Sequence, residues 1–86
     1  MRNLFLQTDF NGDISEWDVS NVRDMTHMFW QCKNFNQPLD NWDVSKVYRM
    51  YGVFTGCENF NQPLDNWDVS NVENMQCMFE YCKNFN

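Results

Sequence analysis

The stretch FNQPLDNWDVS occurs at residues 35–45 and again, unchanged, at residues 60–70. The repetition extends over almost the whole chain at a period of 25 residues, without a gap, in residues 10–34, 35–59 and 60–84. Self-similarity at a fixed period of this size is typical of a repeat protein, in which each unit buries its apolar face against the next one. We therefore expect the 86 residues to form a single solenoid domain.

Both ends of the chain fall inside a repeat. Residues 85–86 begin a further copy, and residues 1–9 are a degenerate version of the back half of a preceding copy. The same offset of 25 places Leu4 on the Phe29 position and Gln7 on the Cys32 position. We expect open repeat faces at both ends and, through them, self-association.

Composition excludes several classes of partner. The formal net charge is −6 and no cluster of Lys or Arg is present, which argues against nucleic acid and anionic membranes. No apolar run is long enough for a membrane-spanning helix. A protein partner with a basic or neutral surface fits the charge best.

The first half of each repeat has the pattern of a strand. Leu39, Trp42 and Val44 follow the spacing L-x-x-W-x-V, which matches the strand signature of leucine-rich repeats. By the alternation of side chains along a strand, Trp42 and Val44 point inward and Asp43 points outward. Trp17, Trp42 and Trp67 should accordingly stack in the core.

The second half of each repeat has the spacing of a helix. One face of a 3.6-residue period contains Val47, Met50, Val53, Phe54 and Cys57, and Ser45 stands where a helix N-cap is expected. The predicted fold is therefore α/β: a right-handed leucine-rich-repeat-like solenoid with a parallel sheet on one side and short helices on the other.

The string FNQPLDNWDVSNV, followed by M-x-x-MF-x-x-C-x-N, resembles a bacterial surface-protein repeat. This is the mycoplasma-type lipoprotein domain of unknown function, which is grouped with BspA-like leucine-rich repeats. The resemblance covers residues 10–86, although repeat one departs from it at Gly12-Asp13-Ile14. It implies surface display or secretion, adhesion or antigenic roles, and no catalytic residues.

Cysteine and histidine usage does not favour a metal or catalytic site. Cys32, Cys57 and Cys82 recur singly at one repeat position, without the paired spacing of zinc sites. If they lie on helices packed about 8–10 Å apart, they are too distant for disulfides and act as small apolar groups. The one histidine, His27, has no repeating partner, so we predict neither an enzyme nor a cofactor.

An acidic column is the clearest candidate site. Asp18, Asp43 and Asp68 should point outward from neighbouring strands about 4.8 Å apart. In one interpretation each Asp accepts local hydrogen bonds from the backbone that follows it. In the other, the column binds a basic protein surface or a cation. The candidate partner-binding residues are Asp18, Asp40, Asn41, Asp43, Asp65, Asn66, Asp68 and, as an exposed aromatic contact, Trp30.

The sequence thus predicts a non-enzymatic protein-interaction module that forms part of a surface-displayed adhesin or antigen. Two alternatives stay open. One is a structural spacer or self-assembling array unit, cellular or viral, and the other is a calcium-dependent binding module.

Overall fold

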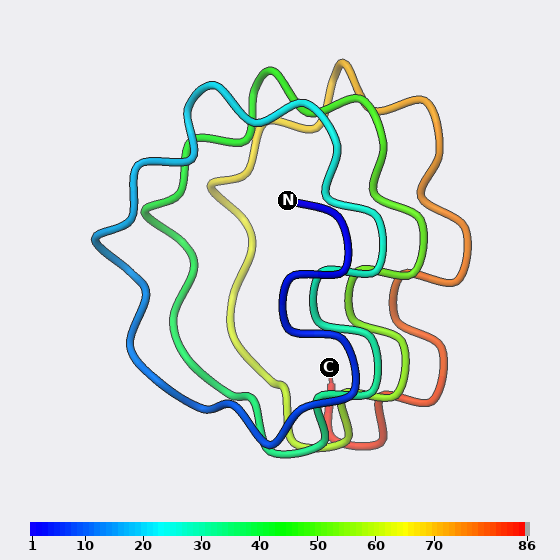
Figure 1. Cartoon of the computed structure of the whole chain (residues 1–86). Helices are drawn as coiled ribbons and strands as arrows, with labels where there is room; N and C mark the ends of the chain where they lie inside the picture. Colours follow the sequence, from blue (N-terminus) through cyan, green and yellow to red (C-terminus); the bar gives the residue numbers. More distant parts are fainter. Residues whose placement is uncertain (86) are drawn as a thin grey trace.

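A computed structural model describes residues 1–85, so Asn86 of the predicted further copy lies outside the described residues. The chain winds into stacked coils, one for each repeat (Figure 1). On one side of every coil the backbone sweeps through a long open curve, and on the other side it zigzags tightly. Equivalent stretches of successive repeats lie side by side.

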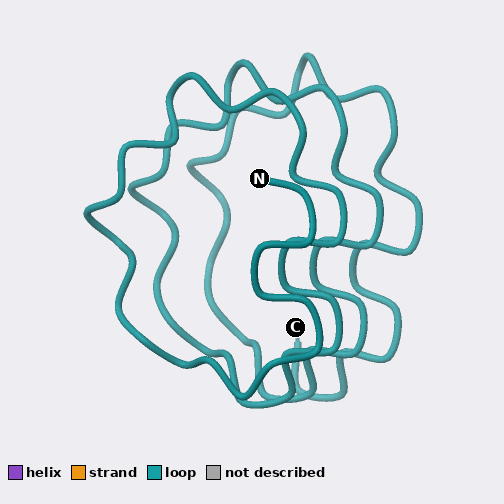
Figure 2. Cartoon of the chain, in the orientation of Figure 1, coloured by secondary structure: helices purple, strands orange, loops and turns teal. Residues whose placement is uncertain are grey.

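The described residues contain no helix and no strand (Figure 2). The only β pairing among them is a pair of isolated parallel bridges, Asp24 with Arg49 and Arg49 with Asn74. The predicted α/β architecture, a leucine-rich-repeat-like solenoid with a parallel sheet and helices, is therefore wrong. The coils are built from turns.

The zigzag side is made of four equivalent stretches that we call ladder segments: residues 1–8, 25–32, 50–57 and 75–82. Within a segment, every second amide closes a four-residue turn, as when Val53 N–H donates to the Met50 carbonyl. The amides in between donate to the next coil, as when Phe54 N–H donates to the Met78 carbonyl at 3.0 Å. The backbone is thus satisfied half within a coil and half between coils.

Positive φ angles explain why the ladder segments are not helices. His27 (φ 58°), Gly52 (61°) and Cys77 (61°) share one repeat position, at the third residue of a four-residue turn. Gln31, Gly56 and Tyr81 share another position four residues later, also with positive φ. A right-handed helix cannot include left-handed residues at this frequency, whereas turns of the type II pattern require one.

The helical spacing predicted from the sequence has a different cause. Met50, Val53, Phe54 and Cys57 all point inward and are 0% exposed. The left-handed residue recurs every four residues, so the backbone returns side chains to one face almost as a 3.6-residue helix does. The inward face was therefore predicted correctly and the backbone that presents it was not.

The open curve of each coil is formed by three arc segments, residues 10–20, 35–45 and 60–70. Each arc bends at turns, such as the one closed by Trp42 N–H and the Leu39 carbonyl. Side chains connect neighbouring arcs: Asn11 Oδ1 accepts from Asn36 N–H at 2.9 Å, and Trp42 Nε1–H donates to the Ile14 carbonyl at 3.0 Å. Neighbouring arcs are thus joined by these side-chain hydrogen bonds, and not by the backbone hydrogen bonds of the predicted parallel sheet.

Aromatic rings fill the space between arcs and ladder segments. Phe29 stacks on Phe54 at 5.6 Å between ring centroids, and Phe54 continues the stack to Phe79 at 5.7 Å. Full burial of a Phe side chain contributes about 1.5–3 kcal/mol. Because each repeat adds one such ring to the stack, each repeat adds a similar hydrophobic contribution to the stability of the fold.

The prediction of three buried tryptophans holds for two of them. Trp42 and Trp67 are 3% and 8% exposed, whereas Trp17 is 41% exposed. Each buried Trp donates its indole N–H to the preceding arc. Trp17 belongs to the first arc segment and has no arc before it.

Residues 1–8 pack as a ladder segment, but in a register different from the expected one. Phe5, not Leu4, takes the position of Phe29 and stacks on it at 5.6 Å. Thr8, not Gln7, meets Cys32, and the pair is 24 residues apart rather than 25. The chain is one residue shorter between this segment and Phe10, a deletion that ungapped subtraction could not detect.

Candidate functional site

The predicted acidic column lies on the exposed side of the arc segments. Asp18, Asp43 and Asp68 are all exposed. In each, Oδ1 accepts the backbone N–H of the serine two residues later at 3.0 Å. The serine hydroxyl also donates to Asp18 and Asp43 at 2.6 Å. The three carboxylates are close enough to act on one another, Asp18 on Asp43 and Asp43 on Asp68, although no strands carry them, and each is engaged in a local turn.

These hydrogen bonds determine the charge state of the column. The bond from the Ser45 side chain, followed by that from its backbone N–H, lowers the pKa of Asp43. Neighbouring Asp18 acts in the opposite direction and is the smallest cause. Asp18 and Asp68 have pKa values lowered by the same kind of serine contacts. The carboxylates are therefore stabilised as anions by their own turns, without a partner.

The other predicted arc residues surround the column. Asp40 is half-buried, and Asn41, Asp65 and Asn66 are exposed. The three arc segments hold seven Asp or Glu residues and no Lys or Arg. The three ion pairs found within residues 1–85 involve Asp24 and Glu58, which lie outside the arcs. The arc side is strongly anionic, but nothing in it converges on a defined ligand position.

The ladder side presents a surface whose residues differ from repeat to repeat. We call it the variable face, and it consists of Thr26, His27, Trp30, Gln31, Tyr51, Gly52, Thr55, Gly56, Gln76, Cys77, Glu80 and Tyr81. Of these residues Thr26, Gly52 and Thr55 are buried, and the others are half-buried or exposed. None of these residues belongs to the hydrophobic core cluster. Tyr81 is 73% exposed, more than any other large hydrophobic side chain of residues 1–85.

Aromatic side chains form the centre of the variable face. His27 packs between Trp30, at 4.5 Å between ring centroids, and Tyr51, at 5.3 Å. The Trp30 ring lies over Gly52, where an added Cβ would approach it to 2.8 Å. Cys77 Sγ is 3.9 Å from the Tyr51 hydroxyl. The half-buried Trp30 is thus held by its neighbours, instead of standing free as the sequence suggested.

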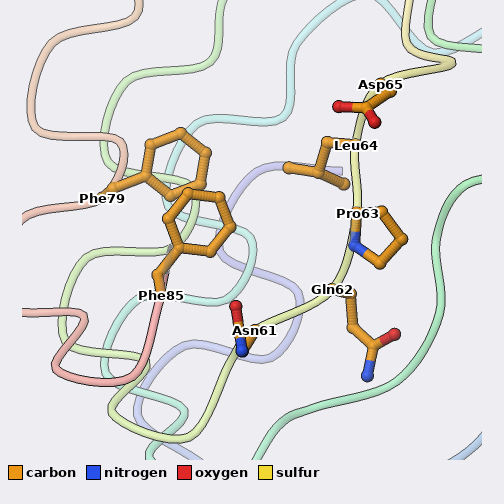
Figure 3. A pocket seen from close by; sticks show the side chains of 7 residues that line it. All are labelled: Asn61, Gln62, Pro63, Leu64, Asp65, Phe79 and Phe85. Carbon is orange, nitrogen blue, oxygen red and sulfur yellow. The ribbon is translucent and has the colours of Figure 1, made fainter.

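A third surface is the open face at the C-terminal end of the stack. It contains a groove of about 500 Å³ lined by Asn61, Gln62, Pro63, Leu64, Asp65, Phe79 and Phe85 (Figure 3). A smaller hollow of about 160 Å³ shares Leu64 and Phe79 with it and adds Trp67, Val69, Met75 and Met78. Met75 is 42% exposed there, whereas its equivalent Met50 is 0% exposed. We call the two hollows together the end groove.

The cysteine column is free of disulfides, but for a reason other than the one expected. The predicted helix-to-helix distance does not apply, because the ladder segments are joined by backbone hydrogen bonds. All four cysteines are unpaired. Cys57 Sγ donates to the Phe29 carbonyl at 2.9 Å, and Cys82 Sγ donates to the Phe54 carbonyl at 2.7 Å. Burial raises the pKa of the Cys57 thiol, so these sulfurs behave as buried, protonated donors.

Within residues 1–85, no three His, Cys, Asp or Glu side chains gather closely enough to hold a metal ion. No helix in this part of the chain is long and apolar enough to cross a membrane. The sequence predicted open repeat faces at the ends of the stack, but it did not predict the end groove or the residues that line it. Trp17 and Met75 are exposed because they belong to the first and the last repeat. The repeat pattern treats all three repeats alike, so it could not predict this difference.

The fold and its surfaces define a stacked-repeat protein whose arc side is identical in repeats two and three, and differs in repeat one at residues 12–16, and whose ladder side carries a face that differs in every repeat. The chain belongs to the family described as "Mycoplasma protein of unknown function, DUF285", whose model matches residues 1–86. This agrees with the mycoplasma-type resemblance. The grouping with BspA-like leucine-rich repeats is not supported, because the coils have neither the strands nor the helices it implies. No curated protein and no solved structure matches the chain significantly.

Proposed function

We propose that the chain is a non-enzymatic protein-binding module whose variable face contacts the partner. The observation that carries this proposal is the division between constant and variable surface. Arc residues 35–45 and 60–70 are identical, while the variable face differs at every repeat. Identical residues are what stacking requires, because each coil must fit the next. The half-buried and exposed side chains that differ between repeats, such as Trp30, Tyr51 and Tyr81, are available for recognition.

The chemistry of the variable face supports contact with a protein. Its large side chains include Trp30, Tyr51 and Tyr81. Tyrosine and tryptophan are enriched at protein interfaces because they bury a large rigid area at a small cost in conformational entropy. Trp30 and Tyr51 are already held in place by His27, which lowers that cost further.

The acidic column supports a weaker form of the same proposal. Its carboxylates are occupied by local hydrogen bonds, so they would act on a partner through long-range charge. Such charge affects mainly the association rate and its salt dependence. A basic partner would be attracted by the arcs and recognised by the variable face. Display on the cell surface as an adhesin or antigen is a prediction from the family resemblance.

The proposal is tested with beads coated with the chain and applied to cultured animal cells. We expect wild-type beads to attach and a variant with Trp30→Ser, Tyr51→Ser and Tyr81→Ser to lose most of this attachment. The matched control carries Asp18→Asn, Asp43→Asn and Asp68→Asn, and it should keep attachment at physiological salt. Circular dichroism confirms that both variants fold. If the control loses attachment while the variable-face variant keeps it, the acidic column is the site and the proposal is wrong.

A further inference from the structure

The ladder side carries a hollow that is centred on the middle repeat. It has a volume of about 270 Å³ and is lined by Gln31, Lys33, Gly56, Glu58, Tyr81 and Lys83. We call it the Gly56 hollow. Its lining consists of two repeat positions, residues 31, 56 and 81 at one and residues 33, 58 and 83 at the other. Repeat two therefore supplies the floor of the hollow, and repeats one and three supply its walls.

The missing side chain of Gly56 leaves this space open. Gln31 and Tyr81 occupy the same repeat position with φ angles of 56° and 62°, close to the 73° of Gly56. The fold thus accommodates a side chain at this position in both neighbouring repeats. A Cβ on Gly56 would lie 3.0 Å from Cγ of Gln31. Glycine here therefore keeps a space free between two larger side chains.

Backbone hydrogen bonds between coils hold the walls of the hollow at a fixed spacing. Gln31 N–H donates to the Thr55 carbonyl at 2.6 Å, next to Gly56 in the chain. Gly56 N–H donates in turn to the Glu80 carbonyl at 2.8 Å, next to Tyr81. The space is thus formed before any ligand arrives, and a ligand that enters it does not have to order the backbone.

The hollow is a positively charged place in a chain whose formal net charge is −6. Lys33, Glu58 and Lys83 stand in one column, and Glu58 Oε1 pairs with Lys83 Nζ at 3.2 Å. Lys33 belongs to none of the ion pairs within residues 1–85. An ammonium group donates hydrogen bonds and accepts none, and its bonds to a carboxylate are among the stronger ones in proteins. The free ammonium of Lys33 therefore favours a ligand with a carboxylate.

The other groups and the size of the hollow suit a single acidic side chain. Gln31 Oε1 accepts a hydrogen bond from Gln7 at 3.2 Å, which leaves the amide N–H groups of Gln31 as donors for a ligand. Tyr81 adds an aromatic ring and a hydroxyl. The volume of about 270 Å³ lies below the range of about 300–1,000 Å³ that is typical of sites for drug-sized molecules.

We propose that the Gly56 hollow binds an acidic side chain of a protein partner, whose carboxylate pairs with Lys33. The partner is that of the proposed function, on which this site depends, because Gln31, Gly56 and Tyr81 belong to the variable face. The acidic column lies on the arc side, whereas the hollow lies on the ladder side (Figure 1). At physiological salt, charges more than about 8 Å apart are largely screened, so the column does not prevent this contact.

The test is an NMR titration of the isotope-labelled chain with the peptide acetyl-Gly-Gly-Glu-Gly-Gly-amide. The uncharged match has Gln in place of Glu. We expect the Glu peptide to shift the amide signals of Gly56 and Glu58, and the Gln peptide to bind about tenfold more weakly, because it lacks the charged hydrogen-bond acceptor. Equal binding of the two peptides, or no shift with either, would overturn the proposal. Shifts with methyl glucuronide but not with the Glu peptide would overturn it too, since the hollow would then take an acidic sugar.

Two variants locate the peptide on the chain. Lys33→Glu reverses the free charge and should abolish the shifts. The matched control, Lys46→Glu, makes the same change of charge at an exposed lysine that does not line the hollow, and it should bind as wild type does. Gly56→Asn fills the hollow with a residue type that tolerates positive φ, and it should also abolish binding. Binding that survives either Lys33→Glu or Gly56→Asn contradicts the proposed site.

Cell attachment separates the failure of this site from the failure of the proposed function. Beads coated with the Lys33→Glu variant should attach less than wild-type beads. If they attach equally well, while the variant with three serines on the variable face does not attach, the face binds its partner without an acidic side chain in the hollow. The proposed site is then wrong and the proposed function stands. If the Glu peptide binds as expected but wild-type beads do not attach, the carboxylate site is supported and the proposed function is wrong.

Discussion

For the single residue Asp43, the geometry of the local turn determines the pKa shift of the carboxyl group. Its Oδ1 accepts two hydrogen bonds from Ser45, and these lower the pKa of the carboxyl below its ordinary value. A carboxyl with a lowered pKa in the folded state stabilises the fold above the pKa of the unfolded chain, about 3.9. That stabilisation is lost as the pH falls through the lower folded-state value.

The first prediction follows from this sign. Asp43→Asn keeps an oxygen acceptor but removes the charge, so it should lower the melting temperature at pH 7. As the pH falls through the lowered pKa of Asp43 in the folded state, the wild-type carboxyl becomes protonated, and the difference in melting temperature between the two proteins should shrink. The control is Glu16→Gln, which removes a charge from an arc residue that makes no hydrogen bond within the described residues. A rise in the melting temperature of Asp43→Asn at pH 7 would show that repulsion along the column outweighs the turn.

The second prediction concerns thiol reactivity. Cys32 and Cys57 are 0% exposed, and burial raises the pKa of both thiols. A buried, protonated thiol reacts slowly because the thiolate is the nucleophile. With a disulfide reagent at pH 8, Cys77 should be labelled first, and Cys57 only at the rate of unfolding. All four thiols should react in denaturant. Mass spectrometry of the labelled peptides provides the check, and rapid native labelling of Cys57 would refute it.

At the level of elements, the sequence of a ladder segment predicted which side chains face inward but not the conformation of the backbone that carries them. Spacing correctly identified Met50, Val53, Phe54 and Cys57 as one inward face. It could not distinguish a helix from turns of four residues, because both return side chains to that face. Gly52 and Gly56, four residues apart, were the one available signal, since both have positive φ. In the other repeats the equivalent residues are not glycine but also have positive φ, so the sequence does not mark these positions as left-handed.

The third prediction compares these two glycines. Gly52→Ala should destabilise by the cost of a left-handed Ala, about 1–2 kcal/mol. It should also incur an overpacking cost of about 1–3 kcal/mol, because the new Cβ would lie 2.8 Å from the Trp30 ring. Gly56→Ala shares the first cost, but its nearest neighbour is the flexible Gln31 side chain at 3.0 Å. In urea denaturation, Gly52→Ala should have a lower free energy of unfolding than Gly56→Ala.

A double variant isolates the ring contact. Trp30→Ala removes the atoms that the Gly52→Ala methyl would meet. The two changes together should therefore cost less than the sum of each alone. If they are additive, the Trp30 ring does not pack over Gly52 as described.

At the scale of the whole molecule, periodicity predicted that equivalent residues of successive repeats lie side by side. It also predicted the acidic column and two of the three buried tryptophans. It missed the features that depend on position along the stack. Trp17 and Met75 are exposed because of which coil they belong to, and the one-residue deletion before Phe10 shifted the register of residues 1–8. A repeat pattern describes an interior coil, so its predictions are weakest at the ends.

The ladder segment of residues 50–57 joins neighbouring coils by backbone hydrogen bonds and is not a helix. The most direct test is the detection of NMR scalar couplings across hydrogen bonds in labelled protein. The structure predicts a coupling between the Phe54 amide nitrogen and the Met78 carbonyl carbon, and an equivalent one between Phe29 and Val53. A helix would instead couple Phe54 to the Met50 carbonyl, four residues earlier. Observation of that coupling, without the one to Met78, would show that residues 50–57 form a helix.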